Sequence, residues 1–443
     1  MEIIQFDDRN LAHYSYALIS NGKMALIDPS RNPQPYYSLA EEKNAQIIAV
    51  VETHPHADFI SSHKEIAETT GATIYVSKLL GADYKHQSFD DDDEIKIGEA
   101  TLKSMNTPGH SPDSISILGI NEEGKEEVLF SGDTLFIGDC GRPDLRESAG
   151  AITAERQALA KNMYHSLRSK LMNLPDDVIV YPAHGAGSLC GKGLSAKNAS
   201  TIGVEKASNW CLQNLSEQEF LAEILSNQPF VPKYFVHSVE LNKRGAGAYR
   251  EGIEKVEISE GITKDLKDYV IIDTRDEAEF KKGHLNNSIN LMNDTKFETW
   301  LGSIVSPGES FYLIADSYDK LEVLITRVAK IGYENQIEKA IVVKEITGNK
   351  SDVFDLNEFK LSPDNFTIVD IRNSNEVKNK SVFSNAVEIP LPELRERVGE
   401  IPTRKPIVVH CAGGYRSAAG ASIIKNYLNS SLPVLDLSYA IKE

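Results

Sequence analysis

The stretch IIAVVETHPHADFISSH, residues 47–63, decides the fold of the first half of this 443-residue chain. Its first six residues are almost continuously apolar, which predicts a short buried strand. His54, His56 and Asp58 then follow at alternate positions, directly after that strand. Because ligands in layered α/β folds bind beyond the strand ends, the stretch predicts a binding site at one edge of a sheet.

Three further segments carry the same kinds of side chain. They are TPGH at 107–110, SGD at 131–133 and YPAH at 181–184, each beside a predicted strand. A lone histidine is more often a surface or packing residue, but four such motifs in order are specific. Imidazole and carboxylate groups are ligands of zinc, iron or manganese. Together the motifs predict a metal site.

The intervening chain alternates strands and helices. Strands are expected at 73–76, 114–118, 127–131 and 177–181, and a helix at 61–70 that ends at Gly71. A longer helix is expected at 152–174, where leucines and a methionine form one apolar stripe that predicts core packing. This alternation predicts a mixed α/β domain over residues 1–245. The chain is expected to leave this domain through the Gly-rich segment 243–252.

The second half contains an internal repeat. VIIDTRDEAEF at 270–280 matches TIVDIRNSNEV at 367–377 with an offset of 97 residues (370 − 273), and strands at 311–314 and 407–410 follow. The repeat predicts two small α/β domains, at 255–345 and 350–443. The chain is therefore an α/β multidomain protein.

The last domain carries a candidate nucleophile, Cys411, in IVVHCAGGYRS at 407–417. A strand ends at the cysteine and a helix is expected from about residue 418. Backbone N–H groups of the loop, the helix N-terminus and the guanidinium would favour a thiolate and stabilise a bound anion. A buried structural cysteine is the alternative. The loop residues are Ala412, Gly413, Gly414, Tyr415, Arg416 and Ser417.

The middle copy lacks these groups. Aligning the two strands places Ala315 at the position of Cys411 and Lys320 at that of Arg416. Without a thiol the middle domain has no nucleophile, so we predict that it is catalytically inactive.

The first 240 residues resemble the metallo-β-lactamase superfamily, which implies an αββα sandwich. Superfamily hydrolases such as glyoxalase II carry HxHxDH and two metals, but Phe59 replaces the last histidine here. GDCGRPD at 138–144 and PAHGAGSLCGK at 182–192 resemble the persulfide dioxygenases instead. That resemblance implies one Fe(II) per chain, held by His54, His110 and Asp133, a set that suits an oxygenase.

Other positions take roles from the same resemblance. His56, Asp58 and His184 would surround the iron ligands, orient them and order water. Arg142 would hold an anionic group of the thiol carrier; its alternative role is that of a surface arginine capping a loop. Cys190 could reach the iron pocket or relay sulfur, and a structural role is equally open for it and for Cys140.

Residues 353–443 resemble rhodanese, in which the loop cysteine carries a persulfide. A cysteine phosphatase is the runner-up, but its loop has five residues between cysteine and arginine, and this loop has four. The whole chain resembles the persulfide dioxygenase–rhodanese fusions. This implies oxidation of a persulfide by O2 to sulfite, and transfer of sulfur through Cys411 to give thiosulfate.

Several alternatives stay open at this point. The carrier thiol could be glutathione, coenzyme A, cysteine or bacillithiol, and the direction of sulfur transfer and a homo-oligomer are undecided. Two other functions are a di-zinc thioester hydrolase of the glyoxalase II type with a sulfur-carrier domain, and a non-catalytic sulfide-sensing scaffold. Phe59 argues against the first, and the intact motifs argue against the second.

Composition excludes some partners. The formal charge is 47 − 65 = −18, which disfavours nucleic acid and anionic membrane surfaces. There is no apolar run of about 18 residues and no signal-peptide pattern. The four cysteines show no CxxC spacing, so a reducing compartment, the cytoplasm, is expected.

Overall fold

The computed structural model describes residues 1–145, 152–262, 266, 268–353, 355–428 and 432–442. The chain divides into two compact units. Unit 1 consists of Met1–Val231 with Phe235–Glu251, and unit 2 of Pro232–Tyr234 with Gly252–Glu443. No helix among the described residues has the length and apolar character that crossing a bilayer requires.

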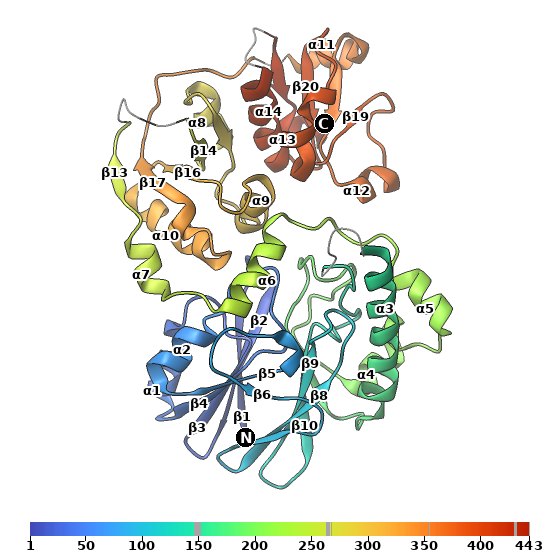
Figure 1. Cartoon of the computed structure of the whole chain (residues 1–443). Helices are drawn as coiled ribbons and strands as arrows, with labels where there is room; N and C mark the ends of the chain where they lie inside the picture. The colour runs from blue at the N-terminus through green and yellow to red at the C-terminus, as the bar shows by residue number, and fades with distance from the viewer. Residues whose placement is uncertain (146–151, 263–265, 267, 354, 429–431, 443) are drawn as a thin grey trace. The chain divides into compact units, whose positions relative to one another are not determined.

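Unit 1 contains two six-stranded sheets (Figure 1). The first has the order β1 (Glu2–Asp8), β2 (His13–Ser20), β3 (Lys23–Ile27), β4 (Gln46–Val51), β5 (Thr73–Val76) and β6 (Gln87–Ser88). The second has the order β12 (Ser200–Thr201), β11 (Ile179–Pro182), β10 (Glu126–Gly132), β9 (Ile115–Ile120), β8 (Ala100–Asn106) and β7 (Glu94–Ile97).

Helices cover the outer face of each sheet. α1 (Gln34–Glu42) and α2 (His63–Thr70) pack on the first sheet through Tyr36, Leu39 and Ile66. α3 (Ile152–Ser169) and α4 (Ile202–Ser208) lie on the second sheet, and α5 (Glu217–Ile224) packs on the outside of α3. The inner faces share a core that includes Leu18, Val51 and Phe130. The arrangement is the expected αββα sandwich. The chain leaves it through α6 (Tyr234–Arg244) and α7 (Tyr249–Glu254).

The long helix is shorter than its apolar stripe predicts. α3 ends at Ser169, and a 3₁₀ turn at Leu171–Asn173 follows. Pro175 stands just beyond this turn, and its ring cannot continue a helix. Leu171 and Leu174 are nevertheless buried in the same core as Leu167, so the predicted packing holds although the helix does not extend to them.

The positions of strand ends explain where a site can form in unit 1. β3 and β4 run parallel, and β10 and β11 run parallel. The carboxyl ends of parallel neighbours lie at the same edge of a sheet, so the loops that follow these four strands are brought together. Asp28, His54, Asp133 and His184 all lie in those loops.

Unit 2 contains two parallel sheets. One has the order β13 (Ile258–Glu260), β17 (Ile337–Val342), β16 (Phe311–Ala315), β14 (Val270–Asp273) and β15 (Ser288–Asn290). The other has the order β19 (Val387–Glu388), β18 (Thr367–Asp370), β20 (Ile407–His410) and β21 (Val434–Asp436).

The helices of unit 2 connect these strands. With the first sheet go α8 (Glu277–Lys282), α9 (Phe297–Ile304) and α10 (Tyr318–Lys330). With the second go α11 (Leu356–Leu361), α12 (Ser374–Asn379), α13 (Leu394–Arg397) and α14 (Tyr415–Leu428). Short 3₁₀ turns of the whole chain are Lys78–Leu80, Leu171–Asn173, Trp210–Leu212, Glu334–Gln336, Pro363–Asn365, Leu391–Glu393, Val398–Glu400 and Ser438–Lys442.

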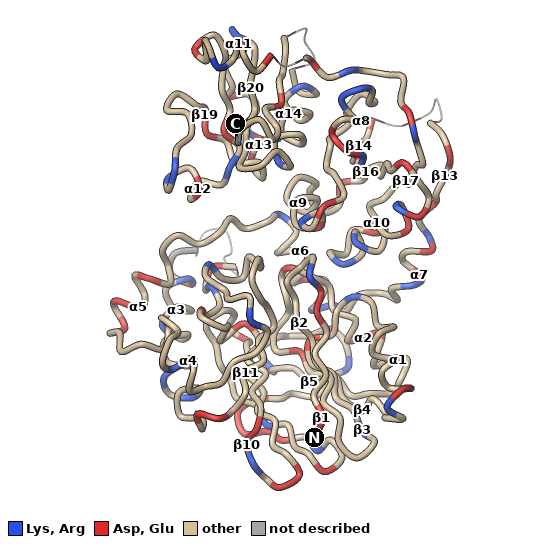
Figure 2. Tube along the Cα trace, turned by 180° about the vertical axis from the view of Figure 1, so that it is seen from behind, with Lys and Arg blue, Asp and Glu red and all other residues tan. Residues whose placement is uncertain are grey.

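The sequence repeat is also a structural repeat. Arg275 pairs with Asp273 at 2.6 Å, and Arg372 pairs with Asp370 at 2.5 Å, both just after the matching strands β14 and β18. Each arginine also donates to a backbone carbonyl eight residues on, at Gly283 and Lys380. These buried pairs tie each strand end to the end of the helix that follows. Acidic and basic residues are interspersed along both units (Figure 2).

Candidate functional site

Three of the predicted ligands, His54, His110 and Asp133, converge at the sheet edge of unit 1. One ligand atom from each lies within 4.8 Å of the other two. Asp133 Oδ2 is 3.5 Å from His110 Nε2 and 3.7 Å from His54 Nε2. All three side chains are buried, and no described residue gives Oδ2 a hydrogen bond. A buried carboxylate oxygen without a partner, facing two imidazole nitrogens, fits a metal cation.

Hydrogen bonds on the far nitrogens orient the two imidazoles. His110 Nδ1 donates to the Arg142 carbonyl oxygen at 2.8 Å, which leaves Nε2 as the unprotonated nitrogen. His54 Nδ1 lies 3.0 Å from Thr53 Oγ1. Thr53 is itself fixed by Asp28, which accepts its N–H at 2.7 Å and its hydroxyl at 2.8 Å. Both Nε2 atoms are therefore directed at Asp133 before any metal binds.

His184 holds Asp133 from the other side. Its Nδ1 donates to Asp133 Oδ1 at 2.7 Å, and its Nε2 lies 2.8 Å from Asp58 Oδ2. Burial alone would lower the pKa of His184, but Asp133 and Asp58 raise it well above the ordinary value. Burial would raise the pKa of Asp133, but His184, His110 and His54 lower it well below the ordinary value. Asp133 is thus ionised at neutral pH, the form that binds metals.

Phe59 occupies the position where the di-metal hydrolases have a ligand. Its ring is 1% exposed. The ring centroid lies 3.8 Å from that of His13 and 4.5 Å from that of His56. His56 Nε2 lies 3.3 Å from Asp28 Oδ1. An apolar ring packed against two imidazoles supplies no ligand atom of its own, and the other ligand atoms near it belong to His56, Asp133 and His184, which lie within 4.8 Å of one another.

Arg142 lies beside the site, but its guanidinium points away from open space. The side chain is 1% exposed, and Nε and Nη2 donate to the two oxygens of Asp144, each at 2.6 Å. Nη1 donates to the carbonyl oxygens of Leu189 and Phe230. The observed part of Arg142 in the site is its carbonyl, which orients His110. Binding of a carrier anion by its guanidinium stays a prediction.

Cys190 lies next to the candidate metal ligands. Its sulfur and the ligand atoms of Asp58 and His184 lie within 4.8 Å of one another. Burial, together with Asp58 and Asp133, raises the pKa of the Cys190 thiol well above the ordinary value. Cys140 is also buried, and burial with a hydrogen bond to Cys211 raises its pKa. Both thiols are therefore protonated in this environment.

Sequence reasoning missed a buried polar layer beneath the ligands. Asp28, Glu52 and His56 have ligand atoms within 4.8 Å of one another. Glu52 accepts from Ser61 Oγ at 2.7 Å, and its Oε1 lies 3.6 Å from Nδ1 of His63, the first residue of α2. Asp28 could have been found, because it directly follows the apolar strand β3 as His54 follows β4. The other contacts depend on tertiary packing.

In unit 2, the loop after β20 surrounds Cys411. The backbone N–H groups of Gly414 and Gly413 lie 3.1 Å and 3.5 Å from the sulfur, as donors. Gly414 has φ +99°, a conformation that other residues rarely adopt. Ser417 Oγ donates to the Gly414 carbonyl at 2.8 Å. α14 begins at Tyr415, three residues before the predicted start, so its first turn lies directly beside the cysteine.

Arg416 is held by a carboxylate of the same domain. Its Nη1 and Nη2 donate to the two oxygens of Glu376 at 2.6 Å and 2.7 Å. Burial would raise the pKa of Glu376, but Arg416 lowers it, so the pair is ionised. In the first sheet of unit 2, Ala315 ends β16 at the position matching Cys411, and Lys320 pairs with Asp316 at 2.6 Å. This fully described loop therefore has no thiol.

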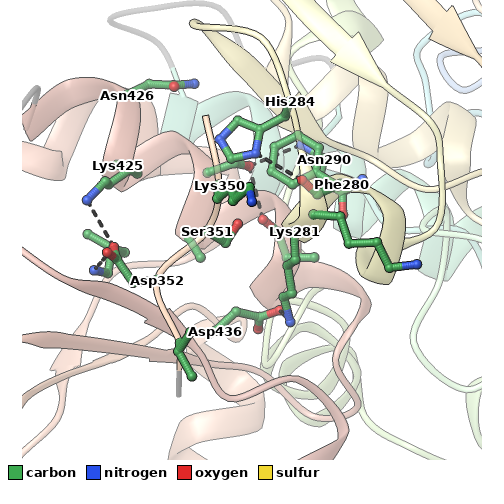
Figure 3. Close-up of a pocket in the computed structure, with 16 residues that line it drawn as sticks. Phe280, Lys281, His284, Asn290, Lys350, Ser351, Asp352, Lys425, Asn426 and Asp436 are labelled. Atoms are coloured by element: carbon green, nitrogen blue, oxygen red, sulfur yellow. Dashed lines mark hydrogen bonds and ion pairs between the residues drawn. The ribbon is translucent and has the colours of Figure 1, made fainter. Parts of the chain in front are cut away.

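A cavity of about 310 Å³ lies between α8 and α14 in unit 2 (Figure 3). Two of the lysines that line it lie near carboxylates: Lys281 lies 2.9 Å from Asp436, and Lys425 lies 2.9 Å from Asp352. The ring of His284, which also lines the cavity, stacks on Phe280, with centroids 4.1 Å apart. The cavity is therefore lined by both charged and aromatic side chains.

Comparisons with known proteins cover most of the chain. Residues 8–184 match the metallo-beta-lactamase superfamily, and residues 258–339 and 355–440 match the rhodanese-like domain. A solved structure described as a metallo-beta-lactamase from Staphylococcus aureus subsp. aureus COL is 31% identical. It superposes with a TM-score of 0.69 and covers 77% of this chain and 99% of that chain.

The curated relatives include persulfide dioxygenases and hydroxyacylglutathione hydrolases. The mitochondrial persulfide dioxygenase of Homo sapiens is 32% identical over 36% of this chain and 58% of its own length. That of Bos taurus is 30% identical over 47% of this chain and 74% of its own length. The hydroxyacylglutathione hydrolase of Prochlorococcus marinus (strain NATL1A) is 31% identical over 38% of this chain and 62% of its own length. The match thus spans just over half of the human relative.

Proposed function

The chain belongs to the persulfide dioxygenases of the metallo-beta-lactamase superfamily, here fused to rhodanese-like domains, and on that premise we propose a two-step function. A low-molecular-weight persulfide is oxidised with O2 to sulfite at a mononuclear Fe(II) site. Sulfane sulfur is then transferred through Cys411 to give thiosulfate. The observation that carries the proposal is the buried Oδ2 of Asp133, which faces His54 and His110 and accepts no hydrogen bond from the described residues.

The residues present fit one iron per chain. His54, His110 and Asp133 would hold it on one face, and the iron would supply the redox chemistry that couples O2 to the sulfur. The chain's own part is to keep these groups in place. Asp28 fixes Thr53 beside His54, the Arg142 carbonyl keeps the proton of His110 on Nδ1, and His184 keeps Asp133 ionised.

The oxidation balances without another cofactor. R–S–SH, O2 and H2O give R–SH, SO₃²⁻ and two protons. The S–S bond breaks, the outer sulfur is oxidised to sulfite, and O2 is reduced by four electrons. The carrier thiol returns unchanged, so the site needs to recognise only the end of the persulfide, and glutathione, coenzyme A, cysteine and bacillithiol all remain candidates for the rest.

The second step uses the loop of Cys411. A second persulfide gives its outer sulfur to the thiolate, R–S–SH + Cys–S⁻ → R–S⁻ + Cys–S–SH. The cysteine persulfide then gives that sulfur to sulfite, forming thiosulfate. The N–H groups of Gly413 and Gly414 stabilise the negative sulfur. We propose that the domain at 350–443 is the active rhodanese, that the one at 255–345 is inactive, and that residues 1–245 form the dioxygenase.

Hydroxyacylglutathione hydrolases among the relatives raise a second candidate, a di-metal thioester hydrolase. The buried ring of Phe59 opposes it, because that position has no ligand atom for a second metal. All four cysteines are free and buried. This supports our proposal of a reducing compartment, the cytoplasm, where disulfides are rare.

Metal content and oxygen uptake test the proposal together. The full-length protein should contain about one iron per chain and consume one O2 per sulfite formed when Cys411 is replaced by serine. The assay uses a panel of persulfides made from the four candidate thiols, with S-lactoylglutathione as the hydrolase substrate. Two bound zinc ions, thioester hydrolysis and no O2 uptake would overturn the proposal in favour of the hydrolase.

A further inference from the structure

The Cys411 loop lies against a residue with an uncommon backbone conformation. Ser438 follows the last strand, β21, and has φ +49°, in the left-handed region that residues other than glycine rarely adopt. A Cβ built on Gly414 would lie 3.2 Å from the Ser438 carbonyl carbon and 3.3 Å from its Oγ, so little room is left between the two backbones. Of the two N–H donors to the Cys411 sulfur, that of Gly414 is the nearer, at 3.1 Å. Ser438 therefore limits how far this donor can move.

The thiol-free domain, residues 255–345, binds Ser438 and the residues beside it. The Ser438 hydroxyl donates to the carboxylate of Glu277, the first residue of α8, and lies 2.7 Å from both of its oxygens. The Ser438 N–H donates to Asp436 Oδ1 at 2.9 Å. Lys281, one turn after Glu277 on α8, lies 2.9 Å from Asp436 Oδ2 (Figure 3). One short helix thus contacts the segment at two of its residues.

Other residues of the cysteine loop also contact the thiol-free domain. Tyr415 donates its hydroxyl to the carbonyl oxygen of Met292 at 3.0 Å. The guanidinium carbon of Arg416 lies 5.5 Å from the ring centroid of Trp300, a residue of α9. These contacts fix the start of α14. The contact through Ser438 differs from them because it reaches Gly414, a donor to the sulfur itself.

We propose that α8 of the thiol-free domain positions the Cys411 loop for sulfur transfer: Glu277 fixes Ser438, and Ser438 keeps the N–H of Gly414 on the sulfur. Glu277 and Ser438 are positioning residues in this role, because they act through Gly414. The inference deepens the proposed function and rests on Cys411 as its nucleophile. It also gives the middle domain, which has no nucleophile of its own, a part in sulfur transfer.

A donor that is fixed in advance suits the chemistry of the loop. The Cys411 sulfur is negatively charged whenever it attacks as a thiolate or leaves as one, and a fixed N–H stabilises that charge without rearrangement during the reaction. A serine with positive φ is strained, and relaxation to negative φ would shift the backbone beside Gly414. The hydrogen bond to Glu277 opposes this relaxation. Loss of the bond should therefore move the donor away from the sulfur.

Substitutions at Ser438 separate the backbone conformation from the hydroxyl. Ser438→Ala and Ser438→Gly both lose the hydrogen bond to Glu277, but only glycine adopts a positive φ without strain. In the full-length protein, Ser438→Ala should lower kcat/KM for sulfur transfer from thiosulfate to cyanide about tenfold. Ser438→Gly should keep most of the wild-type value. Equal values for the two variants would overturn the proposal, because a hydrogen bond that only stabilises the domain is missing from both.

Glu277 is compared with a carboxylate of the same helix. Glu277→Gln keeps an acceptor for Ser438 and should retain most of the activity. Glu277→Ala should slow both sulfur transfer and the alkylation of Cys411 by iodoacetamide at neutral pH, because the thiolate loses its fixed donor. Mass spectrometry of the peptide that contains Cys411 measures the alkylation. Glu279→Ala removes an exposed carboxylate that pairs with Lys282, and it should change neither rate.

Failure of this inference differs from failure of the proposed function. Cys411→Ser should abolish sulfur transfer altogether, and residual transfer would show that the nucleophile is another thiol. Wild-type rates of transfer and alkylation in Glu277→Ala, with no transfer in Cys411→Ser, would leave Cys411 as the nucleophile and contradict only the role of α8.

Discussion

The two carboxylate oxygens of Asp133 have different neighbours. Oδ1 accepts from His184, and Oδ2 faces the imidazoles of His54 and His110 without a hydrogen bond from any described residue. One oxygen therefore fixes the side chain and the other is left for a cation. Because only one of its two oxygens is hydrogen-bonded, the cluster is a candidate metal site and not simply a buried salt bridge.

Replacing one imidazole should separate the two activities of the chain. His110→Ala removes a nitrogen 3.5 Å from Asp133 Oδ2, so bound iron and O2 uptake with a persulfide should fall to near background. Transfer of sulfur from thiosulfate to cyanide should persist, because Cys411 lies in the other unit. Elemental analysis and an oxygen electrode make the measurement. Retention of a full iron equivalent would show that His110 is not a ligand.

Gly141 lets the backbone pass close to two of the candidate ligands, because it has no side chain. A Cβ at this position would lie 2.0 Å from the Asp133 carbonyl oxygen and 3.0 Å from His110 Cβ. Gly141→Ala should therefore displace both ligands and lower iron occupancy several-fold. Gly247→Ala is the matched control, because a Cβ there meets nothing within 4 Å. Iron content at equal soluble yield is the measurement, and unchanged iron in Gly141→Ala would contradict the geometry.

At the scale of elements, the site follows from strand ends. Apolar runs locate β4, β10 and β11 in the sequence, and the side chains just beyond them could be expected to meet. The repeat likewise predicts two similar sheets. It also aligns Ala315 of the first copy with Cys411 of the second. These features were predictable because they depend on local pattern and on the parallel arrangement of neighbouring strands.

Other parts of the site could not be predicted from the sequence. The guanidinium of Arg142 is bound by Asp144, only two residues away, but either residue alone would read as a surface charge. The contact of Trp300 with Arg416 joins residues 116 positions apart (416 − 300) in two domains. Such contacts depend on how whole elements pack, and neither spacing nor periodicity encodes them.

One contact between elements should make stability depend on pH. Arg395 of α13 donates to both oxygens of Glu309, just before β16, at 2.8 Å and 2.7 Å. Burial would raise the pKa of Glu309, but Arg395, the Ser306 backbone and Lys233 lower it. A lowered pKa means that the pair stabilises the fold above the unfolded value of about 4.3. The stabilisation is lost as the pH falls through the lower, folded value.

Glu309→Gln should therefore lower the free energy of unfolding of unit 2 by about 1 kcal/mol at pH 7. The difference from the wild type should shrink below about pH 4. Each unit holds one of the two tryptophans, Trp210 and Trp300, so fluorescence in a Trp210→Phe background reports on unit 2. Glu400→Gln, an exposed partner of Arg397, is the control. A pH-independent difference would show that the pair does not act through its charge.

At the scale of the whole molecule, the two sites should be coupled by their product alone. Cys411→Ser leaves unit 1 untouched, so iron content and O2 uptake should persist, but the main product should change from thiosulfate to sulfite. Thiol-labelling chromatography under air makes the measurement, with His110→Ala as the converse variant. If Cys411→Ser still forms mainly thiosulfate at the wild-type rate, sulfur passes through another thiol, and Cys190, beside Asp58 and His184, is the first to examine.

The edge strand β15 has a consequence for any shortened form of this protein. Side chains of α14 form hydrogen bonds with its backbone: the N–H of Asn290 donates to Ser422, and the Ser288 carbonyl accepts from Asn426. A chain cut after residue 345 would leave this edge bare, and a bare edge strand readily pairs with the same edge of another molecule. Such a fragment should precipitate or form strand-exchanged dimers in proportion to its concentration, so the last domain also keeps its neighbour from self-association.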